Sequence, residues 1–183
     1  MVTGIPTQSS KAAGAVGTAL ASHALSLVDE AATAALGAAL GPALVAGDVV
    51  CLYGGLGAGK SALARAAIRA RLRDPTAEVP SPTYTLINVY EPRTDAPDAI
   101  WHADLYRLGD VEELAELGLD EAFGHAVCLI EWAGRLARGC PARRLDIALS
   151  IAGSGRRAEI TAHGSGWAAV MAAVSSLTVG STA

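Results

Sequence analysis

The feature that most constrains the fold is a glycine-rich stretch between a strand-like segment and a helix-like segment. Residues 49–53 before it are continuously apolar and rich in β-branched side chains, as in a strand that is buried on both faces. Residues 61–74 after it carry apolar side chains at helical spacing with arginines opposite, and Pro75 ends the pattern. A buried strand, a glycine turn and an amphipathic helix in this order predict an α/β protein.

The glycine-rich stretch satisfies the pattern G-x-x-x-x-G-K-[ST] of a phosphate-binding loop. Because glycine has no Cβ, consecutive backbone N–H groups can turn inward around an anion, and the following helix points its N-terminal dipole at the same place. Lys60 offers a positive charge to β- and γ-phosphates, and the hydroxyl of Ser61 can bind Mg²⁺. The loop residues expected to bind ATP with Mg²⁺ are Gly54, Gly55, Leu56, Gly57, Ala58, Gly59, Lys60 and Ser61.

Two carboxylates each end an apolar, strand-like run, as the acidic partner of a phosphate-binding loop does. Glu131 ends one run and Asp104 ends the other. If the strand of Glu131 lies beside residues 49–53, its carboxylate emerges at the carboxyl end of the sheet, where α/β proteins bind ligands. We expect Glu131 to bind the metal or its water shell and Asp104 to lie nearer the attacking water, so that these two and Lys60 are the predicted catalytic residues.

The remaining pattern predicts a three-layer fold of the P-loop NTPase type with a central mixed β-sheet. The sheet is expected to be parallel around residues 49–53 and antiparallel toward the C-terminal pair of strands. Further helices are predicted at residues 29–44, 111–118 and 167–177. Further strands are predicted at residues 83–90, 99–104, 126–131, 145–151 and 157–162.

Composition limits the number of domains and the class of partner. Residues 1–22 are rich in Ala, Gly, Ser and Thr and are expected to be a disordered tail, residues 23–178 a single P-loop ATPase domain, and residues 179–183 a C-terminal tail. A net charge of −4 argues against a protein that binds nucleic acid directly. No apolar run reaches the roughly eighteen residues of a membrane helix, and the first ten residues carry no Lys or Arg, so we expect a cytoplasmic protein.

Some residues have a plain structural explanation from the sequence alone. The three cysteines, Cys51, Cys128 and Cys140, are expected to be reduced and structural. Single residues such as His102 and Trp132 more often pack than catalyse. The segment at residues 80–85 could respond to a γ-phosphate as a switch loop, although a plain loop that enters a strand is the stronger interpretation of its prolines.

Five motifs together resemble one family of P-loop ATPases. Their order and spacing are similar to those of the TsaE family, which acts in the biosynthesis of threonylcarbamoyladenosine on tRNA. The motifs are LYGGLGAGKS (52–61), SPTYTLINVY (81–90), HADLYRL (102–108), EELAELGLDE (112–121) and CLIEWA (128–133). The resemblance covers about residues 29–162 and is specific, because SPTYTL, H-x-DLYRL and IEW occur together with the phosphate-binding loop.

The resemblance implies roles for residues that the pattern alone leaves open. It implies that Lys60 and Ser61 bind the nucleotide phosphates and Mg²⁺, that Glu131 helps to hold Mg²⁺, and that Asp104, Trp132 and Thr33 lie at or approach the ATP. One departure is visible, since Gly55 stands where the family usually has an Asp. The missing carboxylate is expected to loosen nucleotide or metal binding.

The resemblance also implies how the ATPase acts. It implies a switch that binds the TsaD–TsaB complex, meets tRNA only indirectly through that complex, and supports repeated modification by hydrolysing ATP. Because no arginine finger can be identified, we expect slow intrinsic hydrolysis that is faster in the complex. The alternatives are a small-molecule P-loop kinase and a nucleotide-binding adaptor with negligible hydrolysis.

Overall fold

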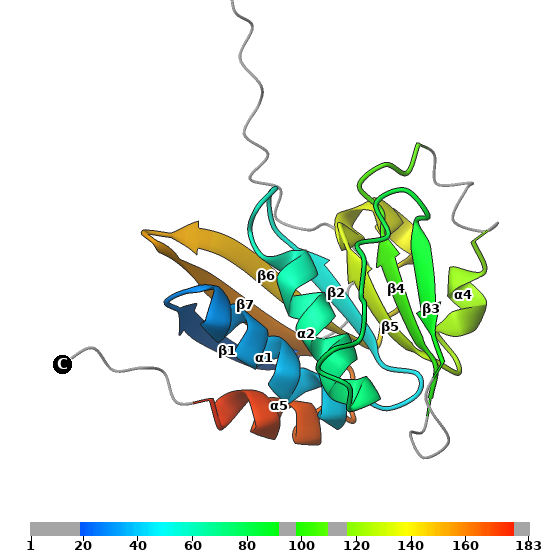
Figure 1. Cartoon of the computed structure of the whole chain (residues 1–183). Helices are drawn as coiled ribbons and strands as arrows, with labels where there is room; N and C mark the ends of the chain where they lie inside the picture. The colour runs from blue at the N-terminus through cyan, green and yellow to red at the C-terminus, as the bar shows by residue number, and fades with distance from the viewer. Residues whose placement is uncertain (1–18, 92–97, 110–116, 178–183) are drawn as a thin grey trace, which may run out of the picture.

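The computed structural model describes residues 19–91, 98–109 and 117–177. Its centre is a seven-stranded sheet in the order β1-β7-β6-β2-β5-β4-β3 (Figure 1). The strands are β1 (Ala19–Leu27), β2 (Val49–Tyr53), β3 (Ile87–Tyr90), β4 (Ile100–Asp104), β5 (Val127–Glu131), β6 (Arg144–Ala152) and β7 (Gly155–His163). β2 is parallel to β5 and β6, whereas β7 is antiparallel to β6 and β1. The predicted mixed sheet is therefore confirmed, including its parallel centre and its antiparallel C-terminal pair.

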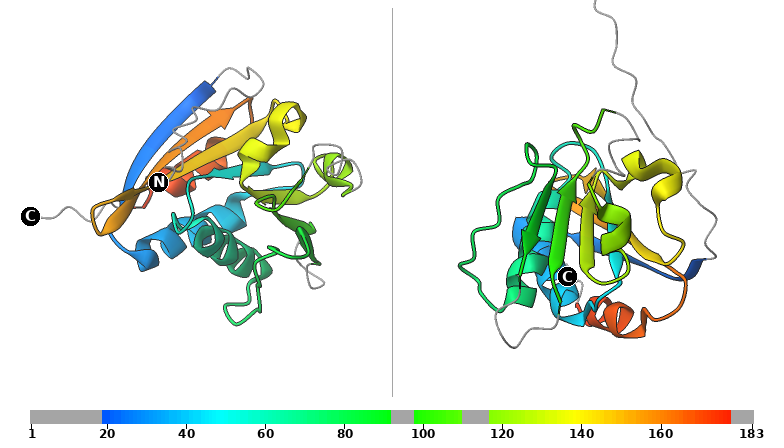
Figure 2. Two further views of the ribbon diagram at one scale, coloured as in Figure 1. Left: turned by 90° about the horizontal axis from the view of Figure 1, so that it is seen from above. Right: turned by 90° about the vertical axis from the view of Figure 1, so that its right-hand side faces the viewer.

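Helices lie on both faces of this sheet (Figure 2). One face is covered by α1 (Glu30–Ala43), α2 (Lys60–Leu72) and α5 (Ala168–Ser175). The other is covered by the short helix α4 (Leu119–Ala122) and the 3₁₀ segment η1 (Ala133–Gly139). Residues of β2 alternate between the two hydrophobic clusters, since Val50 and Leu52 pack in the first and Val49 and Cys51 in the second. A strand buried on both faces explains its continuous apolar sequence.

Close packing of α1 on α2 places the start of both helices beside the glycine loop. Gly37 and Gly41 of α1 lie against the backbone of α2, and a Cβ at either position would overlap Leu63 O or Ala67 O. The side chain of Asp29 caps α1 by accepting a hydrogen bond of 2.7 Å from Ala32 N, as an N-cap carboxylate does. The N-terminus of α1 is thereby held near that of α2.

Two sequence-based boundaries are wrong. The predicted disordered tail ends at residue 22, but residues 19–22 already belong to β1, which pairs with β7. The predicted strand at 83–90 begins only at Ile87, because residues 83–85 form a turn and Leu86 has the left-handed φ of 63°. Of the helix predicted at 111–118, residues 111–116 lie outside the described residues.

The other predicted elements are confirmed with small shifts at their ends. All three cysteines are free and buried, as expected. Within the described ranges, the helices are too short or too polar to cross a membrane.

Candidate nucleotide-binding site

The glycine loop connects the end of β2 to the first turn of α2, as the sequence predicts. Gly59 is the N-cap of α2 and has the left-handed φ of 105°, a conformation that glycine adopts without a steric cost. Gly54 also has a positive φ, and a Cβ there would overlap Leu149 O of β6. The positive φ values of Gly54, Gly57 and Gly59 allow the loop amides to turn toward the point that the N-terminus of α2 faces, as in an anion-binding loop.

Lys60 points back over this loop. Its side chain is 4% exposed, and its Nζ donates hydrogen bonds of 2.9 Å to Gly54 O and 2.8 Å to Gly55 O. The same Nζ lies 3.9 Å from the ring centroid of Trp132. Burial lowers the pKa of Lys60 below its ordinary value, while the charges of Glu131 and Asp104 act in the opposite direction. Its closest partners are neutral carbonyls and a ring face, so the amine can offer its charge to an anion.

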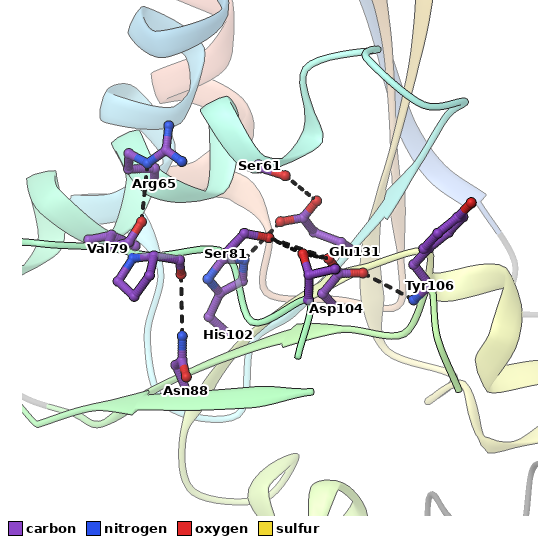
Figure 3. A network of polar contacts seen from close by, with 11 residues as sticks. Ser61, Arg65, Val79, Ser81, Asn88, His102, Asp104, Tyr106 and Glu131 are labelled. Atoms are coloured by element: carbon purple, nitrogen blue, oxygen red, sulfur yellow. Dashed lines mark hydrogen bonds and ion pairs between the residues drawn. The ribbon is translucent and has the colours of Figure 1, made fainter. Parts of the chain in front are cut away.

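Glu131 lies directly across from the start of α2 (Figure 3). Ser61 Oγ donates a hydrogen bond of 2.7 Å to Glu131 Oε2, and His102 Nε2 lies 3.0 Å from Glu131 Oε1. Both His102 and Glu131 are almost fully buried, with 1% and 2% of their side chains exposed. His102 Nδ1 is buried and has no partner among the described residues, so we assign the proton to Nε2, which donates to the carboxylate.

The position of Glu131 follows from the register of the sheet. Glu131 on β5 is level with Leu52 on β2 and with Asp104 on β4, all three strands being parallel. The two carboxylates consequently emerge together at the carboxyl edge beside the loop, as predicted. A hydroxyl and a carboxylate oxygen in contact are the hard oxygen donors that Mg²⁺ prefers, so Ser61 and Glu131 fit the predicted metal.

Asp104 joins two segments that the sequence singled out (Figure 3). Its Oδ2 accepts hydrogen bonds from Thr83 Oγ1 at 3.0 Å and from Ser81 Oγ at 3.4 Å. Its Oδ1 accepts a hydrogen bond of 3.0 Å from Tyr106 N. The segments SPTYTL and DLYRL therefore meet at one carboxylate, next to the loop.

A cavity of about 310 Å³ lies between these groups. Its walls are the glycine loop, the first turn of α2, the SPTYTL segment, Tyr106 and the carboxyl ends of β4 and β5. The predicted residues that line it are Leu56, Gly57, Gly59, Lys60, Ser61, Asp104, Glu131 and Trp132. The predicted residues Gly54, Gly55 and Ala58 complete the loop behind this lining.

Thr33 lies on the other side of the loop. It is fully buried, and its Oγ1 donates a hydrogen bond of 3.2 Å to Asp29 O within α1. Its methyl carbon is 3.3 Å from the position that a Cβ would take at Gly59. Thr33 thus contacts the loop without lining the cavity.

Sequence reasoning missed the role of His102. A lone histidine in an apolar strand has no distinguishing pattern, and only the pairing of β4 with β5 brings it to Glu131. Two signals were available: the H-x-DLYRL motif, which includes His102, and the alternation along β4, which puts His102 and Asp104 on one face.

A larger hollow of about 660 Å³ lies between α1 and α2. Its floor is mostly alanine, and Arg65, Arg69 and Arg73 of the α2 side border it. It includes no residue of the loop at 54–59, so the inward amides that bind phosphate are absent from its lining. The smaller cavity is therefore the candidate site.

Known proteins are similar to this chain in sequence and in structure. The profile of the family described as threonylcarbamoyl adenosine biosynthesis protein TsaE matches residues 27–158. A protein described as tRNA threonylcarbamoyladenosine biosynthesis protein TsaE from Mycobacterium leprae is 46% identical over 123 residues, which are 64% of this chain and 75% of that protein. Its counterpart from Treponema pallidum is 37% identical over 131 residues, 70% of this chain and 91% of that protein. The crystal structure of YdiB from Bacillus subtilis matches with a TM-score of 0.67 at 30% identity and covers 85% of this chain and 95% of YdiB.

Proposed function

Because the chain belongs to the TsaE family, we propose that it is a cytoplasmic, Mg²⁺-dependent ATPase that serves the threonylcarbamoyladenosine modification of tRNA. The observation that carries this proposal is the hydrogen bond from Ser61 to Glu131. It joins the first turn after a phosphate-binding loop to a carboxylate on the neighbouring strand, which is the arrangement that a Mg²⁺–nucleotide needs.

The residues of the cavity would have different roles in ATP hydrolysis. The loop amides and Lys60 would bind the β- and γ-phosphates, and Ser61 and Glu131 would hold Mg²⁺. When bound, Mg²⁺ supplies positive charge that neutralises the phosphate oxygens. Asp104 keeps acceptor capacity beside its three hydrogen bonds and would orient the attacking water. Among the described residues that line the cavity, none is an arginine, which supports slow intrinsic hydrolysis.

The proposed switch consists of the two segments that meet at Asp104. A change at the γ-phosphate end of the nucleotide alters the hydrogen bonds of Asp104 and so reaches the SPTYTL and DLYRL segments together. Exposed apolar side chains stand at the same edge, with Leu56 78%, Tyr84 83% and Tyr106 45% exposed. We propose that this edge contacts a TsaD–TsaB complex, and that the protein meets tRNA only through that complex.

Calorimetric titration of ATP with Mg²⁺ tests the binding site. Wild type should bind, and Lys60→Ala should lose at least about 100-fold in affinity, since a buried charge-assisted contact is removed. A melting curve of the variant shows whether it is folded. Unchanged affinity in folded Lys60→Ala would count against the site.

Product analysis tests the reaction. Inorganic phosphate should form slowly, without a phosphorylated acceptor, and faster when TsaD and TsaB are added. A phosphorylated small molecule would instead indicate a kinase, and no phosphate in a single turnover would indicate an adaptor. A rate that TsaD and TsaB leave unchanged would contradict the proposed switch.

A further inference from the structure

We propose that Arg156 is a nucleotide-binding residue that contacts the α-phosphate from the side of the loop opposite the carboxylates. The proposal rests on the proposed function, because it requires a nucleotide in the cavity. It adds to the site a residue from β7, a strand that contributes nothing to the cavity lining described above.

The alternation of β7 sends its two adjacent arginines to different faces. Arg156 shares a face with Ala158 and Ile160, which are buried beneath the helices. Arg157 lies on the opposite face, where it is 56% exposed and pairs with Glu159 at 3.1 Å. The strand therefore places one arginine toward the layer of α1 and α2 and the other toward solvent.

Arg156 lies directly against the glycine loop. Its Nε is 3.0 Å and its Cδ 3.2 Å from the position that a Cβ would take at Gly59. Thr33 approaches the same position at 3.3 Å. Gly59 thus has the cavity on one side and these two side chains on the other, and it is followed immediately by Lys60.

Among the described residues, no carboxylate forms an ion pair with Arg156. Its Nε is buried and has no hydrogen-bond partner in the described part of the chain. A buried N–H without an acceptor costs free energy, and native structures keep such groups mainly where something else satisfies them. The positive end of the α2 dipole lies at Gly59, next to this side chain, and repels the guanidinium. An anion on the loop would reverse that balance, because the helix dipole, Lys60 and Arg156 would all attract it.

The side of the loop on which Arg156 lies indicates which phosphate it would contact. The carboxylates and Ser61 lie on the β5 side of the loop, where they suit the metal and the γ-phosphate end of ATP. β6 and β7 lie on the other side of β2. A nucleotide whose γ-phosphate is near Glu131 would extend its α-phosphate toward that other side, where Arg156 lies against Gly59.

Calorimetry in EDTA with ADP, ATP and inorganic tripolyphosphate tests the proposal. Arg156→Gln should weaken the binding of ADP and of ATP equally, by about ten-fold, because one charged hydrogen bond is lost from a phosphate that both contain. The binding of tripolyphosphate should weaken by a similar factor, and adding Mg²⁺ should leave the ratio of wild-type to variant affinity unchanged. Arg157→Gln is the matched control, and it should stay within about two-fold of wild type as a surface substitution.

The outcomes separate this inference from the proposed function. Wild type that binds no nucleotide overturns the proposed function itself. Wild type that binds while Arg156→Gln equals Arg157→Gln overturns only the role of Arg156. A loss for ADP and ATP but not for tripolyphosphate overturns the phosphate contact, because the arginine then contacts the adenosine. If Arg156→Gln does not fold, Arg156→Lys and Arg156→Met keep the aliphatic stem, and binding in the order Arg, Lys, Met supports the proposal whereas equal binding overturns it.

Discussion

The two flanks of the glycine loop differ in how their charged side chains are partnered. On the acidic flank, made of Ser61, His102, Asp104 and Glu131, both oxygens of each carboxylate accept hydrogen bonds within the protein. On the basic flank, made of Thr33 and Arg156, the guanidinium has a buried Nε with no partner in the described residues. The carboxylates of one flank are fully hydrogen-bonded, and the guanidinium of the other has no ion pair in the part of the chain that the structure describes.

This difference between the flanks indicates which parts of the site are preorganised. A carboxylate held by two or more donors keeps its orientation, so a metal finds its ligands already in place. A cation without a counter-ion gains its partner only from a ligand, so its contribution appears at binding. Variants on the acidic flank should therefore affect metal dependence and turnover, whereas those on the basic flank affect nucleotide affinity alone.

Glu131→Gln should produce the largest effect, and it is the most direct test of the difference between the acidic and the basic flank. The amide keeps the size of the side chain but loses the charge that a divalent cation requires. Phosphate release with Mg²⁺ should fall by about 100-fold or more, as expected for a lost metal ligand. Nucleotide affinity measured in EDTA should stay within about two-fold of wild type. A parallel loss of affinity in EDTA would show that the acidic flank binds nucleotide without metal.

His102→Asn and His102→Gln form a matched pair that tests orientation by the histidine. The Gln amide can place an N–H near the position of Nε2, whereas the shorter Asn amide cannot. His102→Asn should weaken Mg²⁺ binding in the presence of ADP by about 10-fold to 100-fold, as loss of a group that orients a metal ligand does. His102→Gln should recover most of it. Equal Mg²⁺ titrations for the two variants would leave His102 with a packing role only.

Thr83→Val removes the shorter of the two side-chain donors to Asp104 Oδ2 while keeping the shape of the side chain. The remaining contact from Ser81 is 3.4 Å, near the limit of a hydrogen bond. We expect turnover to fall by about ten-fold, the equivalent of one hydrogen bond to a charged group. Stimulation by TsaD and TsaB should fall with it, and Thr85→Val, which removes a hydrogen bond to Asn88 and none to Asp104, is a control for the same segment. Normal turnover in Thr83→Val would remove Asp104 from the proposed switch.

Gly55→Asp should have the smallest effect. A Cβ at Gly55 meets nothing within 4 Å and the backbone there is not left-handed, so the residue usual in the family fits without strain. We expect Mg²⁺–ATP affinity to rise by no more than about three-fold and stability to stay within about 0.5 kcal/mol of wild type. Gly57→Asp is the control, since that site is equally open but has φ of +73° and should lose about 1 kcal/mol in urea unfolding. Weaker Mg²⁺ binding in Gly55→Asp would contradict the expectation that the missing carboxylate loosens the site.

The centre of the molecule could be predicted from sequence because its signals are local. The strand at residues 49–53, the loop and the start of α2 are consecutive, and each has its own pattern of burial, glycine or helical spacing. The position of Glu131 followed from one assumption about strand pairing, which the register confirms. The strand, the loop and the start of α2 needed no knowledge of distant parts of the chain, and Glu131 needed only this one distant pairing.

The features that sequence reasoning missed depend on distant pairing. β1 has few large apolar residues and only Leu25 and Leu27 are buried, so its sequence does not distinguish it from a flexible segment. Its hydrogen bonds come from β7 at the far end of the chain. The contact of Arg156 with Gly59 likewise depends on the β6–β7 hairpin reaching the loop, which no local pattern indicates.

The pairing of β1 with β7 has a consequence for biosynthesis of the chain. Residues 19–27 leave the ribosome long before their neighbour at residues 155–163, with Leu27 opposite Arg156. Such a distant pairing closes late, because the entropy of a long intervening loop must be overcome first. A nascent chain that stops before β7 carries an intact glycine loop without its flanking arginine. The arginine that we propose for the nucleotide site is consequently missing until β7 has been synthesised.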